Sequence, residues 1–70
     1  MPYPYIVLEF IDKQPCYGYN SRSEADAHLE RVRVNSNMDA RTWDELGGCV
    51  IYDEAVWQTW VQKRGCYCAN

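Results

Sequence analysis

Cysteine is the residue type with the clearest chemical potential in this chain of 70 residues. Cys66 and Cys68 stand two residues apart, so on an extended chain their thiols point to the same side. Thiolates bind zinc and cuprous copper well, and paired thiols support redox chemistry. A tetrahedral metal site would need further ligands from Cys16, Cys49 or His28, and no C-x-x-C knuckle anchors one half of it. The pair therefore predicts metal-binding or redox chemistry only as an alternative function, beside inert cysteines that fill small apolar spaces.

Other catalytic groups are few. His28 is the one histidine, and beside a thiol it would form a nucleophile–base pair, but its place at the edge of a helical apolar stripe is more typical of packing. The double glycine at 47–48 lacks the lysine and serine of a phosphate-binding loop. Adjacent acids, at 44–45 and 53–54, do not face one another on a helix or strand, which disfavours glycosidase chemistry. We therefore expect a protein that is not an enzyme and uses no cofactor.

Negative charge is unevenly distributed along the chain. The formal charge is −3, the pI is about 4.9, and no lysine- or arginine-rich run is present, which disfavours direct binding to nucleic acid. Residues 38–55 hold five carboxylates against one arginine, a net charge of −4, with aromatic side chains among them. The residues predicted to bind a partner are Asp39, Trp43, Asp44, Glu45, Tyr52, Asp53 and Glu54.

These residues suggest a small acidic protein-binding module whose partner carries a basic surface. Carboxylates would imitate the phosphate spacing of nucleic acid or enter an Arg/Lys-rich groove, with Trp43 as the anchor. Inhibitors carried by phages and other mobile elements act in this way as a class, a likeness of size and charge. The hypothesis is a stoichiometric inhibitor that blocks a basic site on a nucleic-acid-handling protein. A merely solvated acidic face is the alternative.

The length fits one domain over residues 1–70, in which three Trp, six Tyr and one Phe supply large contact areas for a small core. No run approaches the roughly 20 apolar residues of a membrane helix, so no membrane association is expected. The start M-P-Y-P-Y has no signal-peptide core. A cytoplasmic location with mostly reduced cysteines follows as an expectation.

These groups must be positioned by the strands and helices of the fold. The order of the expected strands and helices predicts an α+β fold, in which a short antiparallel sheet packs against one or two helices. Tyr5–Ile11 is the strongest strand, with Ile6, Leu8 and Phe10 facing the core. Its other face is half apolar, so the C-terminal element or a second copy of the chain should cover it; a homodimer is therefore a further prediction. Residues 16–19 should return antiparallel after a polar turn at Asp12–Pro15, or else form a loop.

The first helix is predicted over Ser21–Val34, because Ser21 with Glu24 three residues later forms a capping-box pattern. Its buried stripe is expected at Ala25, Leu29 and Val32, with His28 at the edge. Met38–Leu46 reads either as a short helix capped by Asp39 or as an extended arm.

The densest apolar run comes near the C-terminus. Val50–Tyr52 predicts a short strand, and Asp53–Arg64 favours a helix that Asp53 caps and Gly65 ends; a strand with poor alternation is the alternative. The side chains expected on the buried side of that helix are Val56, Trp57, Trp60 and Val61. The tail at 65–70 either adds an edge strand or frays.

Overall fold

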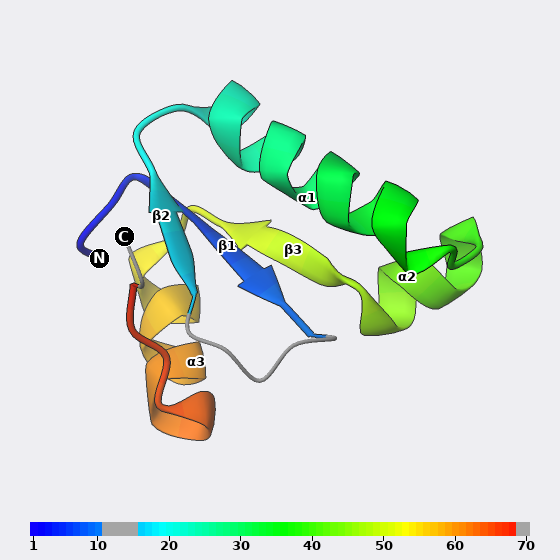
Figure 1. Cartoon of the computed structure of the whole chain (residues 1–70). Coiled ribbons are helices and arrows are strands. Elements are labelled where there is room, and N and C mark those ends of the chain that lie inside the picture. Colours follow the sequence, from blue (N-terminus) through cyan, green and yellow to red (C-terminus); the bar gives the residue numbers. More distant parts are fainter. Residues whose placement is uncertain (11–15, 69–70) are drawn as a thin grey trace.

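The computed structural model describes residues 1–10 and 16–68. Its elements in chain order are β1 (Tyr5–Glu9), β2 (Tyr17–Tyr19), α1 (Arg22–Ser36), α2 (Ala40–Leu46), β3 (Gly48–Ile51) and α3 (Glu54–Arg64). Three helices and a three-stranded antiparallel sheet confirm the predicted α+β class (Figure 1).

The sheet has the strand order β2-β1-β3, so the first strand lies in the middle. Val7 is paired with Tyr17 on one side and with Val50 on the other. The predicted antiparallel return of residues 16–19 is confirmed, whereas Ile11 and the expected turn at Asp12–Pro15 lie outside the described residues. With β2 and β3 at the edges, β1 can be buried on both faces.

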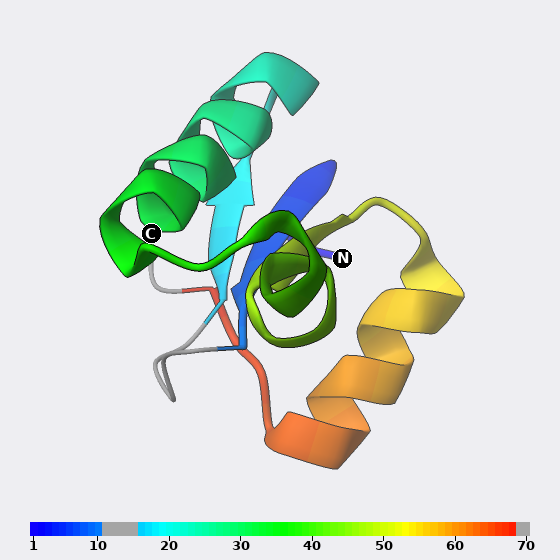
Figure 2. The ribbon, with the colours of Figure 1, turned by 90° about the vertical axis from the view of Figure 1, so that its right-hand side faces the viewer.

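One helix covers each face of the sheet, as the two views in Figures 1 and 2 show. On the α3 side, Ile6, Leu8 and Ile51 form the core with Trp57. Phe10 is half-buried beside them, and its ring centroid lies 5.5 Å from that of Trp60. The prediction that Ile6 and Leu8 face the core is confirmed.

The opposite face of β1 is covered by α1, not by the C-terminal element or by a second copy as expected. Val7 and Ala25 are fully buried in this contact. The face is closed within one chain because α1 presents its small and flat side chains, Ala25 and His28, to the sheet. The half-apolar face of β1 therefore no longer requires a dimer, and the homodimer itself stays a prediction.

Local capping determines where the helices begin and end. Ser21 caps α1 as predicted, and its hydroxyl accepts a hydrogen bond from the Glu24 N–H at 3.2 Å. Asn37 ends this helix at a φ of 57°, and Gly65 ends α3 at a φ of 64°. Residues 40–46 are helical rather than an extended arm, with Asp39 as the cap.

The C-terminal half differs from expectation in details. The helix predicted over 53–64 is confirmed, but Val56 on it is 45% exposed, so its predicted burial is wrong. β3 begins at Gly48, two residues before the predicted start. In the tail, Cys68 forms an isolated parallel bridge with Cys16. No helix within the described residues has the length and apolar character needed to cross a membrane.

Candidate functional site

The first predicted binding residues lie on α2. The Asp39 carboxylate accepts a hydrogen bond from the Thr42 N–H at 2.8 Å, and this bond lowers the pKa of Asp39. The half-buried Trp43 covers Gly47 so closely that a Cβ there would lie 2.1 Å from its ring. Asp39 and Trp43 therefore shape the helix and its end, and partner contact would be a second role for each.

Two exposed carboxylates remain at this end of the molecule. Glu45 lies 3.9 Å from the Arg41 guanidinium, a long pair between exposed groups. No hydrogen bond or ion pair joins Asp44 to any residue that the structure describes. Leu46 beside them is 57% exposed. The α2 end thus offers negative charge next to an apolar side chain.

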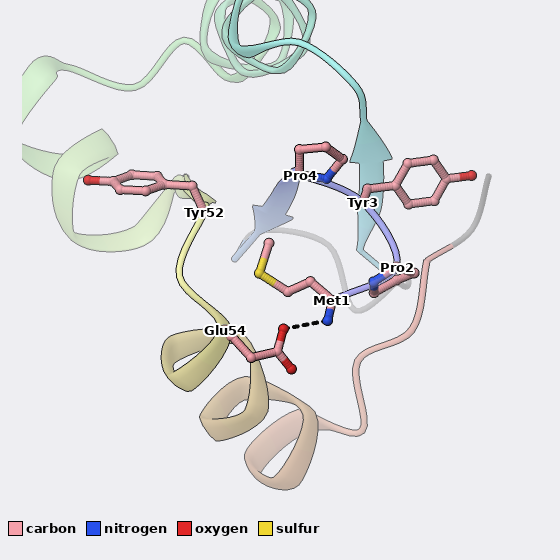
Figure 3. A pocket seen from close by; sticks show the side chains of 6 residues that line it. All are labelled: Met1, Pro2, Tyr3, Pro4, Tyr52 and Glu54. Atoms are coloured by element: carbon pink, nitrogen blue, oxygen red, sulfur yellow. Dashed lines mark hydrogen bonds and ion pairs between the residues drawn. The ribbon is translucent and has the colours of Figure 1, made fainter.

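The remaining predicted residues lie where β3 passes into α3. Asp53 caps α3, accepting hydrogen bonds from the N–H groups of Ala55 at 2.9 Å and Val56 at 3.2 Å. Glu54 accepts hydrogen bonds from the N-terminal ammonium of Met1 (Figure 3) and from the Gln58 amide. The ammonium, followed by the amide, lowers the pKa of Glu54. Both acids are therefore held in place by local partners.

Tyr52 is 65% exposed and borders two hollows. One, of about 420 Å³, is lined by Met1, Pro2, Tyr3, Pro4, Tyr52 and Glu54 (Figure 3). The other, of about 360 Å³, is lined by Val50, Ile51, Tyr52, Asp53 and Val56. The Arg22 guanidinium lies 5.2 Å from the centre of the Tyr52 ring, so one positive charge also borders this corner.

The seven predicted residues do not form one cluster. β3 separates them into an α2 group and a corner group at its two ends (Figure 1). The corner group consists of Tyr52, Asp53 and Glu54. Since β3 is an edge strand, the two groups mark the ends of one edge of the sheet. We call this region, from α2 along β3 to Tyr52, the β3 edge.

The register shows which backbone groups face outward from the β3 edge. The Phe10 N–H donates to the Gly47 carbonyl at 2.9 Å, so the alternating antiparallel pattern directs the backbone groups of Cys49 and Ile51 toward β1. The N–H and C=O of Val50 consequently point away from the sheet. Within the described residues no strand lies on that side. An edge strand with such groups is a template for another extended chain.

Sequence reasoning missed a polar chain beneath α1. The Tyr19 hydroxyl lies 2.7 Å from His28 Nδ1, and His28 Nε2 lies 3.1 Å from the Glu9 carboxylate. The Tyr17 ring packs 4.8 Å from the imidazole. His28 is only 7% exposed, so it stands inside the buried face of α1 and not at its edge as predicted. Both ring nitrogens have partners, which is typical of a structural histidine.

The cysteines gather unevenly. Cys16 is buried, and the half-buried Cys49, Cys66 and Cys68 all pack against the same core, with Cys49 on β3 at the other side of β1. All four are free thiols. Within the described ranges, no three His, Cys, Asp or Glu side chains are grouped so as to hold a metal ion. The described residues therefore provide no set of ligands that would support the metal-binding alternative.

Comparison with known protein families, with curated proteins and with solved structures gave no match.

Proposed function

We propose that the protein acts by stoichiometric binding of a protein partner with a basic surface, through the β3 edge. The observation that carries this proposal is the exposed Tyr52 between two hollows, at one end of an edge strand whose other end carries Asp44 and Glu45. An exposed tyrosine beside a hollow is typical of an interface anchor. The partner class we favour is a nucleic-acid-handling protein, because basic sites of this kind serve phosphate backbones.

An extended segment of the partner would add to β3. The outward N–H and C=O of Val50 supply backbone hydrogen bonds, and the hollow beside Tyr52 and Val56 takes a side chain of that segment. Lysine or arginine residues flanking the segment would meet Asp44 and Glu45. In this arrangement Tyr52 replaces Trp43 as the principal anchor, because Trp43 is half-buried and already packs on Gly47.

Charge and anchor have separable effects on binding kinetics. Reversing Asp44→Lys and Glu45→Lys should slow association by about an order of magnitude at low salt, with little effect at high salt. Tyr52→Ala should act on dissociation and weaken binding by roughly 2 kcal/mol or more. The charge control is Glu24→Lys with Glu30→Lys, which changes net charge equally on the exposed side of α1.

The experiment begins with capture of partners on the immobilised protein, with the Tyr52→Ala variant as the negative bait. The captured partner is then measured by surface plasmon resonance against every variant. Addition of the protein should also displace labelled nucleic acid from the partner at a one-to-one ratio. If folded Tyr52 and Asp44/Glu45 variants bind as the parent does, the β3 edge is only solvated surface and the proposal fails.

A further inference from the structure

The two edges of the sheet are protected to different degrees. The β2 edge is only three residues long, and the tail runs beside its start, where Cys68 forms the parallel bridge with Cys16 (Figures 1 and 2). β3, in contrast, has no charged residue, no proline and no bulge, which are features that commonly prevent pairing at an edge. In the part of the chain that the structure describes, no segment pairs with its outer side. β3 is therefore the edge that is open to a further strand.

The backbone of this edge is complementary to itself. A two-fold axis perpendicular to the sheet, placed beside β3, makes the strand antiparallel to its own copy. The N–H and C=O of Val50 point outward, so with the axis at Val50 they would bond to the C=O and N–H of the second copy's Val50. The same register places Gly48, whose backbone groups point in the same direction as those of Val50, opposite the second copy's Tyr52.

The side chains at the two ends of the β3 edge complement each other as well. One end carries the carboxylates of Asp44 and Glu45 on α2, beside the exposed Leu46. The other end carries the Arg22 guanidinium, 5.2 Å from the centre of the Tyr52 ring, and the hollow of about 360 Å³ beside that ring. Antiparallel pairing brings these unlike ends together, and two-fold symmetry does so twice.

The charges at the Tyr52 end allow an acidic α2 to approach. Asp53 there accepts hydrogen bonds at the positive end of α3, and Glu54 is paired with the N-terminal ammonium. Arg22 donates from Nε to Asp26 at 3.1 Å, so its terminal amino groups can meet a further carboxylate. An incoming Asp44 therefore meets a guanidinium, beside acids whose charge is already compensated.

We infer that the protein forms a two-fold symmetric homodimer, in which β3 pairs with β3 of a second copy and the two sheets become one. Val50 lies next to the axis. Leu46 of each copy enters the hollow beside Tyr52 of the other copy, and Asp44 and Glu45 meet the other copy's Arg22. Because the paired strands are short, the contact belongs to the small and weak class of interfaces, and a dissociation constant in the micromolar range is expected.

The dimer would regulate access to the β3 edge. It occupies the surface proposed for the basic partner, so a partner segment that adds to β3 has to displace the second copy. The inference does not rest on that proposed function, since self-association is measured with the protein alone. A protein that stays monomeric would end the dimer proposal and leave the proposed function as it stands.

Sedimentation equilibrium at increasing protein concentration measures the dimer, with reductant present so that no disulfide between copies contributes. Val50→Pro removes the outward N–H and leaves the bonds of Cys49 and Ile51 to β1 in place, so this variant should fold and be monomeric. In the parent, the amide of Val50 should exchange with solvent more slowly as the concentration rises, because the second copy supplies its acceptor. Circular dichroism confirms that each variant is folded, and the exchange of the Val50 amide decides the question if Val50→Pro is not.

Exchange of charge between the two ends tests the arrangement without altering β3. Arg22→Glu should raise the dissociation constant of the dimer by roughly tenfold, because symmetry repeats the lost contact. Adding Asp44→Arg and Glu45→Arg to this variant should restore the affinity, and only a second copy can bring together positions at opposite ends of β3. The control, Arg31→Glu, makes the same change of charge about two and a half turns along α1, on the other side of the helix, and should leave the affinity unchanged.

Three results would overturn the inference. The first is a monomer at high micromolar concentration. The second is a dimer that Val50→Pro and Arg22→Glu both leave unchanged, which would show that another surface forms it. The third is a dimer that Val50→Pro abolishes but that the exchange of charge does not restore, which would show that the two ends of β3 do not meet as described.

Discussion

The two faces of β1 bury different kinds of side chain. Toward α3 the strand presents Ile6 and Leu8, which pack with Ile51 and Trp57 in an apolar core. Toward α1 it presents Val7 and, two residues later, Glu9, whose carboxylate is hydrogen-bonded to His28. Apolar burial is non-directional, whereas a hydrogen-bonded chain requires one orientation. The comparison suggests that the α3 face supplies most of the stability and the α1 face specifies the position of its helix.

The polar face is satisfied in full. Among the described residues, no buried side-chain nitrogen or oxygen lacks a hydrogen-bond partner. With the Glu9 carboxylate facing Nε2, the tautomer that satisfies the chain carries its proton on Nε2 and accepts the Tyr19 hydroxyl at Nδ1. A satisfied buried network contributes modestly to stability, but breaking it is costly.

The largest expected effect is at Trp57 on the α3 face. Trp57→Ala should lower the free energy of unfolding by about 3–5 kcal/mol, a large part of what so small a domain has. Val56→Ala is the control on the same helix, and because Val56 is 45% exposed it should change stability by no more than about 0.5 kcal/mol. Urea denaturation followed by circular dichroism measures both.

Trp57→Phe keeps this test interpretable if the alanine variant is unfolded, because it should lie between the parent and alanine. Equal effects of Trp57→Ala and Val56→Ala would show that the apolar face is not the main source of stability.

On the polar face, a smaller loss is expected from Tyr19→Phe. It leaves His28 Nδ1 buried without its partner, which should cost about 1–3 kcal/mol. Tyr5→Phe is the matched control, since Tyr5 is paired with Tyr19 in the sheet and its hydroxyl has no hydrogen bond to any described residue. Urea unfolding and the nitrogen chemical shifts of the imidazole report the change. Equal stability of the two variants would argue against the Tyr19–His28 bond.

Local signals predicted the helices well. Ser21, Asp53 and Gly65 each act within a few residues of their own position, so their side-chain chemistry is enough to predict the helix boundaries. The alternation around Ile6 and Leu8 likewise predicted the apolar face.

Contacts between distant residues could not be predicted in the same way. Glu9 and His28 are far apart in sequence, and only the packing of α1 on β1 brings them together. Because the sequence does not show the contact with Glu9, His28 was interpreted as a residue at the edge of the apolar stripe. The acidic stretch also looked continuous in sequence, but β3 runs through it and separates its two halves. A signal was present in Glu9 itself, a charged residue on the half-apolar face of a central strand, which needs a partner when buried.

The smallest expected effect concerns the exposed contact that closes the N-terminal end of α3. The N-terminal ammonium lowers the pKa of Glu54, so the folded protein binds this proton more weakly than the unfolded chain does. The contribution of Glu54 to stability is therefore present above the ordinary glutamate pKa and is lost as the pH falls through the lowered folded pKa. Glu54→Gln should remove this part of the pH dependence between neutral pH and about pH 3.

Because Glu54 is exposed, the effect should be small and should shrink in high salt, unlike the loss at Trp57. Acetylation of the N-terminus removes the ammonium charge, so the acetylated parent should show the same dependence of stability on pH as Glu54→Gln. Glu45→Gln is the control, since Glu45 lies on α2 away from the N-terminus. The stability of the parent, the acetylated parent and the two variants is measured as the urea midpoint of unfolding at each pH. If neither acetylation nor Glu54→Gln alters the acid limb, the ammonium contact does not hold the end of α3, and the α3 face depends on apolar packing alone.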